Sequence, residues 1–413
     1  MIRKTLIVVG AGPAGLIAAI TAADAGYEVT IFESMTKPAR KLGISGKGRG
    51  NVTNTAPYDQ FLAHFNNRGR FLKTAFKKFF NTDLVAFLAK EGLQTKEERG
   101  GRVFTASDRA TDIVDCLHKA VLRRGISLKL GTPVRDLLIK DGICQGVTTG
   151  TYKFYANAVI LATGGLSYPA TGSTGDGLKF AKNLGHSIVK PLPSLCGLKP
   201  SEALPPYLEG VNPRNIGVQL YVDGKKVAEE FGEMLFQDGY LAGPVMITLS
   251  RLAVPALDKG QKCHVLIDLK PALDHQKLDN RLLRDIAEKK DGRFIDIVGG
   301  LLPSGLRQYC IKSLRLNTTC KADQAKAEDR KKLRMWLKEL RFDVVGHASW
   351  NQAIVTAGGI STKEIDPTTM ESKLIKNLYF AGEIMDIDAD TGGFNLQAAF
   401  STGYLAATAI TTK

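Results

Sequence analysis

The stretch that decides the fold is TLIVVGAGPAGLIAAITAADAGYEVTIFE, residues 5–33. It begins with the apolar run Thr5–Val9, which is typical of a strand buried on both faces of a parallel sheet. A glycine-rich segment at 10–15 follows and opens an apolar helix that ends near Gly26, and a second strand runs over 28–33. The pattern predicts one strand–helix–strand unit of about 30 residues.

The glycine-rich segment reads G-x-G-x-x-G between that strand and that helix, which is the context that gives the motif its meaning. Gly10 permits a tight turn, Gly12 lets the backbone approach a pyrophosphate at the positive end of the helix, and Gly15 allows close helix–strand packing. Glu33 ends the second strand, where a carboxylate accepts hydrogen bonds from ribose hydroxyls and repels a 2′-phosphate. The segment therefore predicts a site for FAD or NAD rather than NADP.

Two later segments favour FAD over NAD. The buried strand at 158–161 ends in Ala-Thr-Gly-Gly, and the segment 378–383 is followed by a glycine turn that opens an apolar helix. The first amides of that helix, at 394–396, could donate to flavin N1 and O2, where reduction develops negative charge. A nicotinamide enzyme with one Rossmann unit has no use for this second helix start, so we expect FAD.

The composition narrows the class of protein. With 44% hydrophobic and 23% charged residues among 413, the chain can form a core and is not expected to be disordered. No run approaches the ~18 apolar residues of a membrane helix, and no signal peptide is evident, so we expect a cytoplasmic protein without a membrane partner. The formal charge of +15 favours anionic partners without selecting one.

The cysteines and histidines point away from metal and thiol chemistry. The six cysteines include no C-x-x-C pair and no metal-ligand spacing, so we expect reduced, mostly buried thiols and no metal. His186 is expected to pack after a helix. No second G-x-G-x-x-G stands between a strand and a helix, so NAD(P)H, if it is used, would bind transiently rather than in a domain of its own.

Changes of pattern along the chain predict its organisation. Helical periodicity is expected at 71–80, 82–91 and 107–124, and a meander of three strands after 126. The chain becomes rich in proline after residue 190, and from about residue 353 its composition is again glycine-rich and apolar, as in its first part. We expect an α/β protein with a Rossmann-like FAD-binding domain that is interrupted by an insertion. The expected parts are 1–190 and 353–413 for the FAD-binding domain, 191–275 for a β-rich insertion, 276–341 for a helical subdomain and 342–352 for a return strand.

Several longer motifs resemble one family of bacterial flavoproteins. These motifs are KLGISGKGRGNVTN at 41–54, STGDG at 173–177, TAGGI at 356–360, TMESK at 369–373 and the tail from Gly382 to Asn395. They resemble NAD(P)/FAD-dependent oxidoreductases of the aminoacetone-oxidase and 3-dehydro-bile-acid-reductase type, with a glutathione-reductase-like fold, over essentially the whole chain. The resemblance implies that residues 45–51 wrap the flavin, with Arg49 at the pyrophosphate or the ring edge. It also implies that Glu383 contacts the ribityl chain. Val134, in a strand that leads into the meander, would contact adenine.

The sequence departs from the family pattern at four positions. Gly50 stands where the family usually has Cys, Gln237-Asp238 stands for Thr-His, and Ala242 stands for Ser before Gly-Pro. The last three positions are expected to face the substrate. The family's substrate is therefore not carried over to this chain.

Two sets of site residues follow. The residues expected to contact non-covalent FAD are Gly10, Gly12, Pro13, Ala14, Gly15, Glu33, Lys41, Ser45, Gly46, Gly48, Arg49, Asn51, Val134, Ala162, Thr163, Gly164, Gly382, Glu383, Gly393, Phe394, Asn395 and Leu396. The candidates for catalysis on the substrate side are Ser167, Tyr168, Asp386 and Asn395, and each can equally serve as a loop hydrogen-bonding residue.

The expected function is that of an FAD-dependent oxidoreductase. A small organic substrate would exchange hydride with flavin N5, with NAD(P)H or O₂ as the other redox partner. A nucleic-acid (tRNA) modifying FAD enzyme and a non-catalytic flavin-binding protein stay open as alternatives. The former draws on the net charge and on the basic and aromatic stretch 68–80, which fits an amphipathic helix better than a stacking platform. We therefore expect a small molecule rather than nucleic acid as partner, and the sequence leaves the substrate and the oligomeric state, a monomer included, open.

Overall fold

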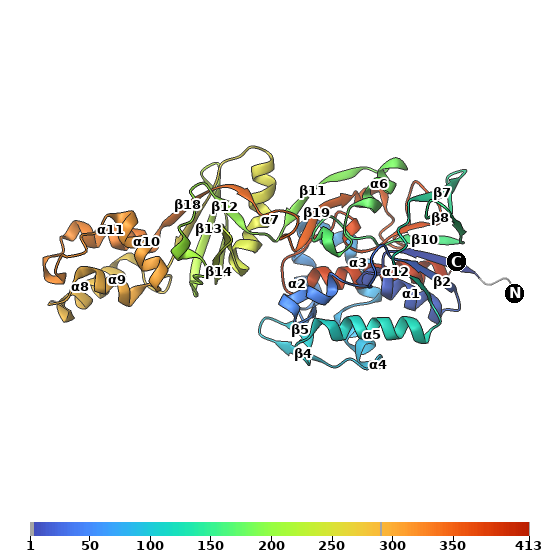
Figure 1. Ribbon diagram of the computed structural model, residues 1–413, viewed down its shortest axis with the longest axis horizontal. Helices are drawn as coiled ribbons and strands as arrows, with labels where there is room; N and C mark the ends of the chain where they lie inside the picture. The colour runs from blue at the N-terminus through green and yellow to red at the C-terminus, as the bar shows by residue number, and fades with distance from the viewer. Residues whose placement is uncertain (1–3, 290, 413) are drawn as a thin grey trace. The chain divides into compact units, whose positions relative to one another are not determined.

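The computed structural model describes residues 4–289 and 291–412 and divides the chain into two compact units (Figure 1). Unit 1 consists of Met1–Pro193 and Ala353–Lys413, and unit 2 consists of Ser194–Gln352. The chain therefore leaves unit 1 once, forms unit 2, and returns.

Unit 1 is built on a five-stranded parallel sheet in the order β20-β10-β1-β2-β6. Its strands are β1 (Thr5–Val9), β2 (Glu28–Phe32), β6 (Ser127–Lys129), β10 (Ala158–Leu161) and β20 (Leu378–Phe380). The strand order reverses between β1 and β10, so the chain leaves these two neighbouring strands toward opposite sides. Open parallel sheets bind ligands beyond the carboxyl ends of their strands at such a switch point.

Helices cover this sheet and complete the core of unit 1. They are α1 (Pro13–Asp24), α2 (Tyr58–Ala63), α3 (Gly69–Lys78), α4 (Asn81–Lys90), α5 (Ala110–Arg123), α6 (Asp176–Asn183) and α12 (Phe394–Thr411). α1 packs directly on α12. A Cβ at Gly403 would lie 2.2 Å from the carbonyl oxygen of Ala14, so only glycine allows the two helices to approach this closely. The strand–helix–strand unit predicted at 5–33 is confirmed.

Three smaller sheets surround the parallel one. β7 (Asp136–Lys140), β8 (Ile143–Thr148) and β9 (Lys153–Tyr155) form the predicted antiparallel meander. The others are β3 (Asn51–Asn54), β5 (Arg102–Thr105) and β4 (Thr95–Glu98) in one sheet, and β11 (Ile188–Ser194) with β19 (Val355–Ile360) in another. Val134 does not lie in a strand, contrary to the prediction. The chain leaves the parallel sheet after Lys129, and the amides of Gly131 and Thr132 bind the carbonyl oxygens of Met35 and Glu33 instead.

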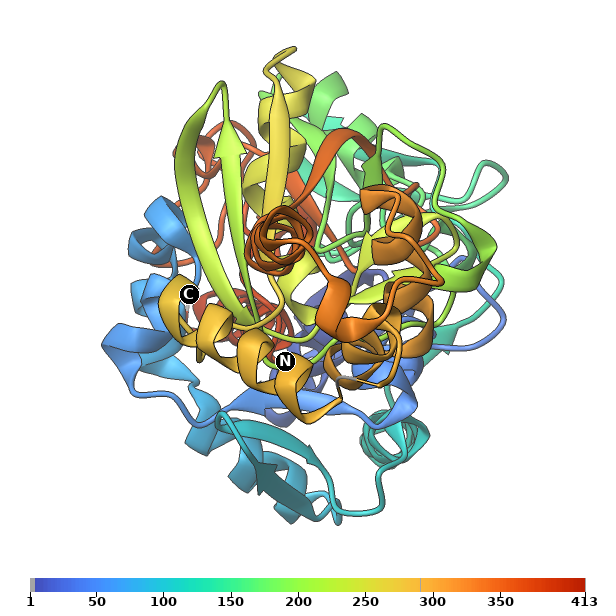
Figure 2. The same cartoon turned by 90° about the vertical axis from the view of Figure 1, so that its left-hand side faces the viewer.

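Unit 2 holds a seven-stranded antiparallel sheet in the order β14-β13-β17-β18-β12-β16-β15. The strands are β12 (Leu198–Pro200), β13 (Ile216–Val222), β14 (Lys225–Gly232), β15 (Leu235–Gln237), β16 (Tyr240–Ala242), β17 (Cys263–Asp268) and β18 (Leu340–His347). Helix α7 (Pro244–Asp258) packs on this sheet. Figure 2 shows the long β13–β14 hairpin, against which α7 packs.

Four helices follow β17 and form the helical part of unit 2. They are α8 (His275–Glu288), α9 (Phe294–Leu301), α10 (Ser304–Leu314) and α11 (Ala327–Lys338). The return strand β18 begins at Leu340, inside the range expected to be helical. Burial alternates residue by residue from Leu340, with Phe342 and Val344 also buried, because this segment lies on the sheet.

Three further features concern the cysteines, membrane-spanning helices and metal ligands. All six cysteines are free, five of them buried and Cys320 half-buried, as predicted. Within residues 4–289 and 291–412, no helix has the length and apolar character needed to span a bilayer. No group of three or more potential metal ligands gathers within those ranges either.

Candidate functional site

The glycine turn joins β1 to α1 at the carboxyl edge of the parallel sheet. Gly10 has φ 104°, and a Cβ on it would lie 2.5 Å from the carbonyl oxygen of Ala162. A Cβ on Gly15 would lie 1.9 Å from the carbonyl oxygen of Gly10. At Gly12, in contrast, nothing lies within 4 Å of an added Cβ. Packing therefore requires the first and third glycines, whereas the second leaves the start of α1 open to a ligand.

Glu33, directly after β2, lies at this turn. Its Oε2 accepts a hydrogen bond of 2.8 Å from the amide of Ala11, and its Oε1 accepts one of 2.8 Å from the amide of Met35. Gly172, in the loop after β10, approaches the same place, since a Cβ there would lie 3.6 Å from Glu33 Oε1. Ser34 Oγ also donates to Glu33 Oε1, at 3.3 Å. A carboxylate has about four lone-pair sites, so one remains for a ribose hydroxyl.

Glu383, in the turn Gly382–Ile384 after β20, forms a second acidic centre at this edge. Lys41 Nζ donates to Glu383 Oε2 at 2.6 Å and also to Ser167 Oγ. Ser167 Oγ and the amide of Thr356 each donate to Glu383 Oε1 at 2.8 Å. Burial opposes ionisation of Glu383, but Lys41, Ser167 and the Thr356 amide outweigh it and hold the pKa of Glu383 below its usual range.

Two buried hydroxyl groups have no protein partner among the described residues. They are Ser45 Oγ and Thr163 Oγ1. An unpaired buried polar group costs ~1–3 kcal/mol, so such groups call for an explanation. Both residues belong to segments expected to contact FAD. A bound dinucleotide could accept hydrogen bonds from these two unpaired hydroxyls, and its pyrophosphate could approach the open start of α1 at Gly12. The residues present therefore fit a bound dinucleotide.

The start of α12 is the third glycine-rich element of the site. Gly393 precedes the helix with φ 102°, and a Cβ there would lie 2.3 Å from the carbonyl oxygen of Thr53. No side chain caps this helix, which leaves its first amides for a ligand. The side chain of Asn395 is engaged elsewhere: its amide group exchanges hydrogen bonds of 2.8 and 3.0 Å with the backbone of Ala389.

Two charged pairs lie beside the start of α12. Arg68 pairs with Asp386, whose side chain is 8% exposed. Burial raises the pKa of Asp386 above its usual range, although Arg68 acts to lower it. His64 Nδ1 lies 2.7 Å from Asp390 Oδ2, and the His64 ring stacks on Phe394 with centroids 3.8 Å apart.

Arg68, His64 and Thr356 were not predicted as site residues from the sequence. Arg68 and His64 lie in and near the basic, aromatic stretch 68–80, whose pattern predicts an amphipathic helix and does not indicate contact with Asp386 or Phe394. Thr356 stood in a motif used for the resemblance, and its amide and hydroxyl turn out to bind Glu383 and the loop at Ser167.

Several expected site residues have other partners in the structure. The Arg49 guanidinium donates to Asp108 Oδ1 at 3.0 Å and Glu98 Oε2 at 3.1 Å and stacks over Phe104 at 4.4 Å. These acids raise the pKa of Arg49. Contact of its side chain with FAD would require the pairs to open, and it stays a prediction. Tyr168 has φ 52°, is half-buried, and has a pKa raised by burial.

The residues that depart from the family pattern occupy two places. Gly50 has φ 76°, and a Cβ there would lie 3.0 Å from Ala110 Cα, so a larger residue would be strained. Gln237, Asp238 and Ala242 lie in one hairpin of unit 2, formed by β15 and β16. Whether this hairpin faces a substrate stays a prediction. His186 is buried, with Nε2 2.8 Å from Ser372 Oγ, which confirms its packing role.

Comparison with known proteins identifies the fold and the family. The model of the family described as HI0933-like protein Rossmann domain matches residues 4–409. The 3-dehydro-bile acid delta(4,6)-reductase of Clostridium scindens is 28% identical over 403 residues, which cover 97% of each protein. The ribosomal RNA dihydrouridine synthase of Escherichia coli is 29% identical over 413 residues, covering 98% of each.

A solved structure supports the same fold. The open conformation of a flavocytochrome c3 fumarate reductase aligns with a TM-score of 0.52 and 18% identity, covering 99% of this chain and 78% of that one. At this identity the likeness shows the fold alone. The expected α/β fold with a Rossmann-type FAD-binding domain and the resemblance to a flavoprotein family are both confirmed.

Proposed function

This chain belongs to the HI0933-like Rossmann-domain family and is an FAD-dependent oxidoreductase, and we propose that it reduces a carbon–carbon double bond conjugated to a carbonyl group in a small organic molecule. The names of the two relatives support this reaction class. One is a delta(4,6)-reductase of a 3-dehydro-bile acid, and the other makes dihydrouridine. Both names describe saturation of a double bond that a carbonyl group activates.

One observation supports the flavin assignment most directly, the hydrogen bond that ties Glu33 to the glycine turn before α1. Glu33 lies on the glycine turn, and the buried hydroxyls of Ser45 and Thr163 have no protein partner. In this proposal the start of α1 holds the pyrophosphate and Glu33 the adenosine ribose. Glu383, fixed by Lys41, lies toward the ribityl chain.

FAD, when bound, supplies hydride exchange at its N5. Overall, the substrate takes up a hydride at the carbon β to its carbonyl group and a proton at the α carbon, and NAD(P)H, the proposed donor, is oxidised. The chain must therefore supply a proton and position the carbonyl group. Asp386 is our candidate proton source because it is buried at this edge, its pKa is raised, and Arg68 orients it.

A second candidate substrate is a uracil base in RNA. Two observations favour it: the formal charge of +15 and the name of the Escherichia coli relative. Uracil carries the same conjugated double bond, so the flavin chemistry and the residues that hold the cofactor would be unchanged.

Anaerobic half-reactions test the proposal. The purified holoenzyme is reduced with NADH or NADPH and then mixed with a 3-oxo-Δ4 steroid, with cyclohexenone or with uridine-containing RNA. We expect reoxidation by at least one of these acceptors, with a product heavier by two hydrogen atoms in mass spectrometry. Cyclohexanone, which lacks the double bond, is the control and should leave the flavin reduced. Reoxidation by O₂ but by none of the unsaturated acceptors would overturn the proposal in favour of an oxidase.

A further inference from the structure

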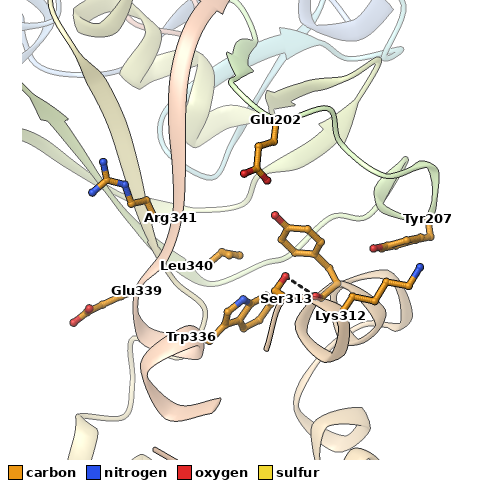
Figure 3. Close-up of a pocket in the computed structure, with 9 residues that line it drawn as sticks. Glu202, Tyr207, Lys312, Ser313, Trp336, Glu339, Leu340 and Arg341 are labelled. Atoms are coloured by element: carbon orange, nitrogen blue, oxygen red, sulfur yellow. Dashed lines mark hydrogen bonds between the residues drawn. The ribbon is translucent and has the colours of Figure 1, made fainter. Parts of the chain in front are cut away.

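Unit 2 contains a groove that plays no part in the expected flavin site. It lies between α10, α11 and the start of β18 and has a volume of about 590 Å³ (Figure 3). Cavities of roughly 300–1,000 Å³ are the size that small ligands and single ligand groups occupy. Because three of its lining side chains are aromatic, we call it the aromatic groove.

The three aromatic side chains are Tyr207, Tyr309 and Trp336, and all are half-buried. The rings of Tyr309 and Trp336 lie with centroids 6.2 Å apart and planes 57° apart, whereas Tyr309 stacks on Phe342 at 6.0 Å with the planes 9° apart. Phe342 is buried and so anchors the Tyr309 ring from behind. Aromatic rings that are held in place yet remain partly exposed in a concave site offer stacking surfaces for a planar ligand.

The charge around the groove is asymmetric. Lys312 Nζ lies 4.8 Å from the centroid of the Tyr207 ring, and Figure 3 shows both on one side of the groove. The segment 297–322, which contains α10, has no Asp or Glu, whereas it carries four cations, Arg307, Lys312, Arg315 and Lys321, all of them exposed. Exposed cations on a segment that contains no acid and contributes Tyr309 and Lys312 to the groove are complementary to a polyanion with planar bases.

The groove also holds two carboxylates, Glu202 and Glu339. They oppose the binding of a phosphate at their own positions, but carboxylates accept hydrogen bonds from the ring N–H and amino groups of a base. The opposite rim carries Arg341, whose guanidinium donates to Asp343 and is therefore partly neutralised. The cationic side is consequently that of α10.

We propose that the aromatic groove binds a nucleobase of single-stranded RNA, stacked on Trp336 and bordered by the tilted ring of Tyr309, with the adjoining phosphates on Lys312 and Arg315. A strand is favoured over a free nucleotide because the segment 297–322 carries four exposed cations and no acid, more positive charge than one phosphate requires. The site is distinct from the stretch at 68–80. In that stretch Phe76 and Phe79 are buried in the core of unit 1, so they offer no stacking surface.

Fluorescence anisotropy with a labelled, single-stranded oligouridylate tests this on the full-length holoenzyme. We expect saturable binding that weakens steeply as salt rises. Trp336→Leu should weaken it about tenfold, since stacking on one ring contributes roughly 1–3 kcal/mol per base. Trp336→Phe, which keeps a ring, should restore most of the affinity. Lys312→Ala should weaken binding and reduce its salt dependence, whereas Lys225→Ala, an exposed cation on β14 outside the groove, should do neither.

Competition decides between a strand and a free nucleotide. UMP at the same nucleotide concentration should displace the oligomer poorly. Displacement as effective as that by unlabelled oligomer would overturn the proposal and make the groove a mononucleotide site. No measurable binding, or equal binding by the wild type, Trp336→Leu and Lys312→Ala, would also overturn it. FAD content and the reduction of unsaturated ketones are read out separately, so failure here leaves the proposed function standing.

Discussion

The amide of Ala11 donates a 2.8 Å hydrogen bond to Glu33 Oε2, which ties the acid after β2 to the glycine turn after β1. Because both oxygens of Glu33 accept backbone amides, its position does not depend on a ligand. The proposed ribose contact is therefore preorganised in the protein.

Replacing this acid should weaken FAD binding. Glu33→Gln keeps an acceptor but loses the charge-assisted contact, worth ~1.5–3 kcal/mol. We expect the Kd for FAD to rise roughly tenfold to a hundredfold, measured by flavin fluorescence titration of apoprotein. Glu28→Gln, an exposed position on β2, is the matched control. An unchanged Kd for Glu33→Gln would place the ribose elsewhere.

Removal of an unpaired hydroxyl should change the stability of the apoprotein and its affinity for FAD in opposite directions. Ser45→Ala relieves a buried group that lacks a partner, so apoprotein should become more stable by about 1 kcal/mol while FAD binds more weakly. Ser250→Ala is the control, since that hydroxyl is buried but donates to Ile247 and accepts from Cys196. It should lose stability without a change in FAD affinity. Thermal melts and FAD titrations of both variants measure this, and equal FAD affinity of Ser45→Ala and wild type would contradict a flavin contact.

The Glu383 cluster should stabilise the apoprotein in a pH-dependent way. The folded state lowers the pKa of Glu383, so its contribution is fully present above the ordinary value of 4.5 and is lost as pH falls through the lowered pKa. The difference in unfolding free energy between wild type and Glu383→Gln should therefore shrink below pH 4.5. Denaturant titrations between pH 7 and 3 check this. Lys41→Met, which removes the cation instead, should show the same trend, and a gap that widens on acidification would refute the assignment.

The proton donor is tested by the pH dependence of turnover. If Asp386 donates, the rate requires its protonated form and falls as pH rises through its raised pKa. Asp386→Asn should lower kcat about 100-fold, a typical contribution of general acid catalysis, without slowing reduction of the flavin by its donor. Arg68→Met removes the cation that lowers this pKa. The pH at which the turnover rate falls should therefore be higher in this variant. If the turnover rate of Arg68→Met falls at the same pH as that of the wild type, Asp386 is not the proton donor.

Reduction by NAD(P)H should depend strongly on salt. No second dinucleotide-binding motif occurs in the sequence, so the phosphates of the nicotinamide cofactor would rest on surface cations, whose attraction is screened beyond ~8–10 Å at physiological ionic strength. Stopped-flow reduction at two ionic strengths measures the apparent affinity. Tight saturation that salt does not change would reveal a specific nicotinamide site.

The first strand–helix–strand unit and its glycine turn could be predicted from the sequence, because residues close together in the chain determine their structure. The apolar run of β1, the glycine spacing and Glu33 all lie within the first strand–helix–strand unit, where backbone sterics at Gly10 and Gly15 leave one turn geometry. The β-rich insertion at 191–275 was likewise predicted from residue order.

The remaining contacts join residues that are far apart in the chain. Lys41 and Glu383 are 342 positions apart and meet because they follow β2 and β20, two strands of the same parallel sheet. Arg68 meets Asp386 where α3 packs on α12. The partners of Arg49 and the aromatic groove arise in the same way. Periodicity tells which face of an element is buried, but strand order, register and helix packing decide which side chains share a site. The sequence alone thus determined the cofactor class and its first binding turn, and only the tertiary structure decided which acids are buried, which hydroxyls stay unpaired and where a second ligand could stack.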